Sequence, residues 1–195
     1  MHHRMFDREV RGRAIPAGTS MEGTKQYVWV GYDFERFVTS YLLFGNSSTR
    51  IGTSSSESDT EYGVGVLFNL LNREVMDPIL GRNLVFNIIR VNGGIEYTSS
   101  GGSFHHNNLE WRELYISLTL SLVNELTGET FFVPDSVGIF GGPVYSHYHG
   151  ADLEEEDSIG YSAGLELYFS EKMSVYLGLH SLGTAGNMAG LRMRF

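Results

Sequence analysis

The chain has 195 residues, enough for one domain of ordinary size, and 42% of them are hydrophobic. Its formal net charge of -9 argues against nucleic acid as a partner, because binding to phosphates needs lysine and arginine. Cysteine is absent, which excludes disulfides and thiolate chemistry, and no apolar run is long enough to predict a transmembrane helix.

The N-terminal segment, MHHRMFDREVRGRAIPAG, is polar and has no apolar core of the kind that marks a signal peptide. We interpret residues 1–24 as a flexible leader and residues 25–195 as the folded domain. The missing leader peptide does not indicate a cytoplasmic protein.

Alternation of apolar and polar residues with a period of two dominates the rest of the chain, and it predicts β-strands. The clearest case is YISLTLSLV with the leucine before it, where Leu114, Ile116, Leu118, Leu120 and Leu122 share one face. Eight strands are expected, at 26–46, 60–71, 83–98, 109–124, 135–149, 158–169, 173–181 and 186–195. Breaks at DFER (33–36) and VNGG (91–94) would give ten strands instead. We prefer eight, which groups the long polar connections at one end.

Strands with one apolar face fit either a soluble β-sandwich, with that face inside, or a membrane barrel, with that face toward lipid. The strands are at or above the roughly 9–11 residues that cross a bilayer. The polar faces carry acids, bases and tyrosines that could fill a small lumen. The candidates for lumen ion pairs are Glu61, Glu113, Glu166, Arg192 and Arg194. Aromatic residues lie near strand ends, as in an interfacial girdle: Phe44, Tyr62, Tyr97, Phe169 and Phe195. The sequence therefore predicts an all-β, antiparallel up-and-down transmembrane β-barrel.

The chain ends Gly190-Leu191-Arg192-Met193-Arg194-Phe195, which resembles the carboxy-terminal assembly signal of bacterial outer-membrane barrels. Residues 162–195 look like the last three strands of the OmpA/OmpX-like eight-stranded family. The resemblance implies that Gly190, Met193 and Phe195 form the signal read by the barrel-assembly machinery. It also implies residence in the bacterial outer membrane, in contact with its lipid and lipopolysaccharide.

Three groups of residues are candidates for chemical sites. His147 and His149 share one strand face, and His105 and His106 are expected at the same end, but three or four ligands with zinc geometry are not evident. His180 and Ser181 suggest a barrel lipid A deacylase, yet adjacent strand residues face opposite ways. The acidic run from Asp152 to Asp157 does not have the spacing of a calcium loop.

We expect a non-catalytic outer-membrane barrel with a role in membrane integrity or surface interaction through its loops. No cofactor, metal or nucleic acid is expected, and a surface ligand is left open. The alternatives are a lipid A-modifying barrel enzyme, a small-solute channel and a soluble β-sandwich binding module.

Overall fold

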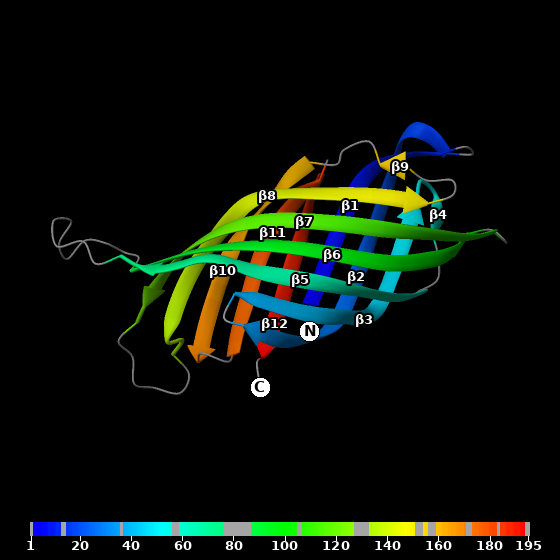
Figure 1. Cartoon of the computed structure of the whole chain (residues 1–195). Coiled ribbons are helices and arrows are strands. Elements are labelled where there is room, and N and C mark those ends of the chain that lie inside the picture. The colour runs from blue at the N-terminus through cyan, green and yellow to red at the C-terminus, as the bar shows by residue number, and fades with distance from the viewer. Residues whose placement is uncertain are drawn as a thin grey trace.

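The protein consists almost entirely of β-strands in a computed structural model (Figure 1). The structure describes residues 2–12, 15–35, 37–55, 59–75, 87–104, 107–126, 133–150, 154–155, 159–170, 173–182 and 184–193. In that part of the chain, no helix has the length and apolarity needed to span a membrane. The long strands are β1 (His2–Gly12), β2 (Ile15–Glu35), β3 (Val38–Ile51), β5 (Asp59–Glu74), β6 (Ile88–Phe104), β7 (Asn107–Glu125), β8 (Ser136–Gly150), β10 (Ile159–Ser170), β11 (Met173–Leu182) and β12 (Thr184–Met193). Two short strands, β4 (Ser54–Ser55) and β9 (Glu154–Glu155), lie beside them.

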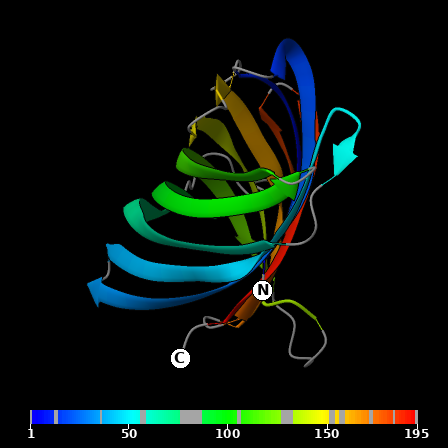
Figure 2. The same cartoon turned by 90° about the vertical axis from the view of Figure 1, so that its right-hand side faces the viewer.

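The ten long strands form one closed antiparallel barrel, in which neighbours in sequence are neighbours in space. β8 pairs with β10, and β12 returns to β1 through His2↔Gly190 and two further residue pairs. Figures 1 and 2 show the single sheet curving around on itself, with both chain ends near the same rim. We call that rim the terminal end and the opposite rim the far end. The closed sheet confirms the up-and-down barrel and excludes the two-sheet sandwich as the fold.

The preference for eight strands is wrong, because two strands were not recognised in the sequence. One was missed because the outward residues of two paired strands are all even-numbered. The stretch 26–46 contains the end of β2, a turn and most of β3, so the break at DFER is real. Val28 pairs with Phe44 and Val30 with Leu42, so even positions face outward on both strands. The apolar alternation therefore continues through the hairpin as if one strand ran across it. Asn92 and Gly93, by contrast, lie inside β6 and form no turn.

The second missed strand is β1, which lies within the segment predicted as a flexible leader. Residues 1–24 contribute β1 and the first part of β2, which pair from His2↔Tyr27 to Gly12↔Ile15. The outward positions on this part of β2 are polar, including Glu22, Thr24 and Gln26, so no apolar alternation marks it. Both added strands lie before Val38, so the later polar connections stay at the far end, as the eight-strand grouping expected. Two of these connections are much shorter than expected, since only 105–106 and 183 separate the strands there. The longest connections, 75–87 and 126–135, lie at the terminal end.

Polarity in the barrel is inverted relative to a water-soluble protein. On β7, Ile116, Leu118 and Leu120 are 38%, 46% and 48% exposed, whereas Glu113 and Ser121 on the other face are buried. The buried polar residues of the whole described chain are Arg4, Lys25, Ser47, Thr49, Glu61, Thr98, Ser100, Glu113, Ser121, Ser146, Ser162, Glu166, Ser174 and His180. Because alternate residues on a strand face opposite sides, one periodic pattern makes the outside apolar and places these polar groups inside. They lie there beside buried apolar and aromatic side chains such as Met21, Leu43 and Trp111.

Candidate functional site: charged clusters inside the barrel

Lys25 lies at the centre of the most extensive interior contacts. Its Nζ donates to Oε1 of Glu61 on β5 at 2.8 Å and to Oε2 of Glu113 on β7 at 2.8 Å. All three side chains are almost completely buried. The three residues come from β2, β5 and β7, which are not adjacent to one another in the barrel, so the ammonium group joins separate parts of the wall across the interior.

Glu113 extends these contacts to two more strands. It accepts hydrogen bonds from the Ser146 Oγ at 2.8 Å and the Tyr148 Oη at 3.3 Å, both on β8. From β1, the Arg4 Nη2 lies 3.8 Å from its Oε1, and the Arg4 guanidinium lies over the ring of Tyr115 at 4.1 Å. We name Arg4, Lys25, Glu61 and Glu113 the Lys25 cluster. Its two cations and two carboxylates balance, which is the condition under which buried charges are tolerated.

A second set of polar contacts lies nearer the terminal end and centres on Glu166 of β10. Its carboxylate accepts from the Ser174 Oγ at 2.6 Å, the Tyr168 Oη at 2.8 Å and the Arg192 Nη1 at 3.2 Å. The guanidinium of Arg90, from β6, lies over the Tyr168 ring at 5.1 Å. We name these five residues the Glu166 cluster. Tyr41 and Glu96, joined by a hydrogen bond of 2.7 Å, form a further pair in the interior.

Four of the five residues predicted to form ion pairs in the lumen lie within the described residues. Glu61, Glu113, Glu166 and Arg192 all point inward, and Arg192 meets Glu166. Glu61, for which an arginine partner was expected, contacts Lys25 instead. Arg194 lies outside the described residues.

Lys25, the cation at the centre of the Lys25 cluster, was not predicted from the sequence. Lys25 shares odd parity with Tyr27 and Trp29, which face inward beside it, and that parity was the available signal. No sequence pattern pointed to Arg4, because it lies in the segment that was interpreted as a leader.

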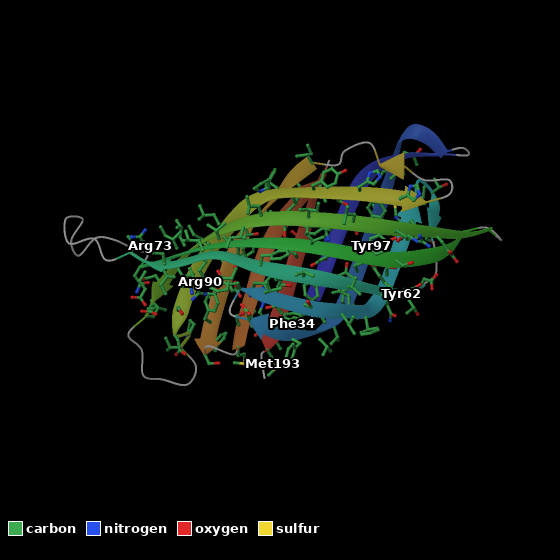
Figure 3. The ribbon with its side chains drawn as sticks, in the orientation of Figure 1. Phe34, Tyr62, Arg73, Arg90, Tyr97 and Met193 are labelled. Carbon is green, nitrogen blue, oxygen red and sulfur yellow. The ribbon has the colours of Figure 1, made fainter. Side chains whose placement is uncertain are left out.

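The residues of the expected assembly signal have different surroundings. Gly190 faces inward, where a Cβ would overlap the ring of Tyr176, so the structure explains a glycine there by close packing. Met193 faces outward, is 51% exposed and is labelled at the rim in Figure 3. Phe195 lies outside the described residues.

The histidines and the acidic run do not form a metal site where they are described. His147 and His149 point outward from β8 and are exposed. His105 and His106, and all of Asp152–Asp157 except Glu154 and Glu155, lie outside the described residues. Among the residues that the structure describes, no three His, Cys, Asp or Glu side chains are grouped to hold a metal ion.

His180 has a structural position at the barrel seam. The β1–β12 ladder ends at Arg4↔Met188, and just beyond it the buried His180 reaches from β11 to β1. Its Nε2 donates to the carbonyl oxygen of Met5 at 2.7 Å. Gly186 of β12 lies between them, and a Cβ there would overlap the Met5 oxygen. Ser181 lies on the opposite face of the strand, so the two side chains are not a nucleophile–base pair.

The outer surface has a belt of apolar residues with aromatic residues toward the far end. These aromatic side chains are Phe44, Tyr62, Tyr97, Tyr145 and Tyr161, all exposed. Phe44 pairs directly with Tyr62, and Tyr97 lies opposite Val64 on the next strand. Figure 3 shows Tyr62 and Tyr97 toward the same end of β5 and β6. Beyond them the outward residues become polar, as with Arg112 on β7 and His149 on β8.

Comparison of the chain with protein-family models and with curated proteins finds no match. The residues and their geometry therefore carry the functional argument.

Proposed function

We propose that the chain is a non-conducting β-barrel of a bacterial outer membrane, which serves membrane integrity and presents its far-end connections for surface contacts. The observation that carries this proposal is the inverted polarity of a closed barrel. In water, such an exposed apolar belt would oppose folding to a monomer. In lipid, the closed barrel pairs its backbone groups internally and its belt meets acyl chains.

The dimensions of the belt support a membrane environment. On β7 the outward apolar residues run from Leu114 to Leu122, which is roughly 27 Å along a strand at about 3.4 Å per residue. A tilt of about 40° reduces that length to roughly 20 Å, near the height of the apolar band in outer-membrane barrels. The aromatic residues at one border of the belt match an interfacial girdle. The resemblance at the C-terminus implies that the terminal end lies at the periplasmic rim, which would place the far end outside the cell.

The interior supports a structural role over conduction. The Lys25 cluster ties β1, β2, β5 and β7 together across the lumen, and its side chains are buried on all sides. A catalytic role has less support, because His180 donates to backbone at the seam. The resemblance at the C-terminus adds lipopolysaccharide and the barrel-assembly machinery as partners. The ten strands, however, differ from the eight of the OmpA/OmpX-like family.

Refolding and bilayer conductance test the proposal together. The protein is expected to fold in detergent micelles or vesicles, and its electrophoretic mobility on a gel should then change on heating. In detergent-free buffer it should aggregate. In planar bilayers the folded protein should give no discrete conductance steps. Folding to a soluble monomer without detergent would overturn membrane residence, and steps from the wild-type protein would overturn the closed lumen.

A further inference from the structure

Arg90 differs from the other cations of the interior. Arg4, Lys25 and Arg192 each lie within 4.0 Å of a carboxylate, at 3.8, 2.8 and 3.2 Å respectively. Arg90 has no such contact within the described residues; its guanidinium lies over the Tyr168 ring at 5.1 Å. Its Nε is buried and has no hydrogen-bond partner. A guanidinium is always charged and has five N–H donors, so this group is under-satisfied.

Arg192 lies on the other side of the same polar contacts. Tyr168, against which Arg90 stacks, donates to Oε2 of Glu166, and Oε1 of Glu166 accepts from Arg192. The Nε of Arg192 is also buried without a hydrogen-bond partner. Its side chain is nevertheless 31% exposed, so solvent reaches this part of the barrel. The Glu166 cluster itself has two cations and one carboxylate, and therefore one net positive charge. Within the described residues, the inward carboxylate of Glu96 accepts a hydrogen bond from Tyr41 at 2.7 Å and forms no ion pair with either arginine.

An uncompensated cation in a partly buried site is unfavourable, and an anion from solution would remove that cost. The planar fork of a guanidinium matches the oxygens of phosphate or carboxylate better than it matches a spherical ion. We propose that a small oxyanion, with inorganic phosphate as its simplest form, binds inside the terminal end of the barrel between Arg90 and Arg192.

The inward orientation of the two arginines favours a free anion over a lipid headgroup as the ligand. Arg90 contacts β10 although β7 and β8 separate β6 from β10, so its side chain crosses the lumen. Lipid headgroups would meet the outer face of the barrel, where Arg73 of β5 is exposed beside Ile89. A free anion in solution therefore fits the site better than a phospholipid. The exposed carboxylates of Asp33, Glu35 and Glu125 at the same end would weaken the binding.

Calorimetric titration with inorganic phosphate tests this site in a non-ionic detergent, with ionic strength held constant by sodium chloride. The wild-type protein should bind phosphate saturably, and Arg90→Gln should weaken binding by at least tenfold. Arg73→Gln is the matched control, because it removes an exposed arginine from the outer face near the same end (Figure 3), and it should bind like wild type. No saturable binding by the wild type, or equal weakening by Arg73→Gln, would overturn the proposal.

Two further experiments deal with variants that fail to fold and with a lipid headgroup as the ligand. Heat-sensitive gel mobility first shows that each variant is folded. Should Arg90→Gln fail to fold, Arg90→Lys and Arg192→Gln replace it, and unchanged phosphate affinity in both folded variants would contradict the site. Added phosphatidylglycerol should not compete with phosphate, and competition would assign the site to a lipid headgroup instead. The assay needs the folded barrel but no membrane, so its outcome is separate from that of the proposed function.

Discussion

Lys25 Nζ lies 2.8 Å from Oε2 of Glu113, although 88 positions separate the two residues in the chain. The contact is buried and joins β2 to β7 through the middle of the barrel. Such a contact has large consequences when one partner is lost, because the other charge stays buried without compensation.

The first prediction concerns Lys25. Lys25→Met keeps an unbranched side chain, one heavy atom shorter, but leaves Glu61 and Glu113 facing each other without the ammonium group. We expect the free energy of unfolding in vesicles to fall by about 3–5 kcal/mol, measured by urea titration. Arg73→Gln, on the exposed face, should change it by no more than about 0.5 kcal/mol. A loss equally small for Lys25→Met would contradict the central place of the cluster.

Neutralising the carboxylates should compensate for the loss of Lys25. We expect the triple variant Lys25→Met, Glu61→Gln, Glu113→Gln to be more stable than Lys25→Met alone, because no unpaired charge remains in the lumen. The comparison uses the same urea titration, with the double variant Glu61→Gln, Glu113→Gln as the control that keeps the lysine. If the triple variant is the less stable of the two, the destabilisation by Lys25→Met has a cause other than buried charge.

The seam gives a third prediction. His180→Ala removes the donor for the Met5 carbonyl and should lower the free energy of unfolding by about 1–3 kcal/mol. Hydrogen exchange should rise at the β1 and β12 amides but hardly change on β6 and β7, on the other side of the barrel. Equal exchange at both places would show that the histidine does not hold the seam. Ser181→Ala, on the opposite strand face, is the control.

The C-terminal resemblance gives a fourth prediction. Deleting Phe195 should lower the amount of assembled barrel in cells more than it lowers stability after refolding, because the residue is expected to be read during assembly. The assembled fraction is measured by heat-sensitive gel mobility of outer-membrane preparations, and stability by urea titration of refolded protein. Met193→Leu serves as a conservative control within the signal. Parallel losses in both measurements would reduce Phe195 to a packing residue.

The sequence predicted the fold class because the physical constraint is local. A strand with one lipid-facing side must alternate, and β7 shows this from Leu114 to Leu122 without interruption. This alternation does not reveal the hairpin between Glu35 and Val38, because the outward residues are even-numbered on both β2 and β3. It also missed β1, whose selection as a strand depends on pairing with β2 and β12 and not on its own apolar pattern.

The sequence predicted which residues face the interior better than it predicted which of them contact each other. Inward parity identified Glu61, Glu113 and Glu166 as lumen residues. Which cation meets each of them depends on how residues far apart in sequence line up across the lumen, as Lys25 does with Glu61 and Glu113. The seam contact of His180 has a similar origin, since Gly186 leaves room for the imidazole to reach a third strand.

The proposed function requires that the outer face of the barrel contacts lipid. The chain has no cysteine, so single cysteines can carry spin labels without background at chosen sites on β7. In phospholipid vesicles, labels at Leu118 and Leu120 should be accessible to oxygen and protected from a water-soluble nickel chelate. A label at Arg112 should show the reverse. Nickel access at Leu118 and Leu120 equal to that at Arg112 would show that the outer face of β7 contacts water and not lipid.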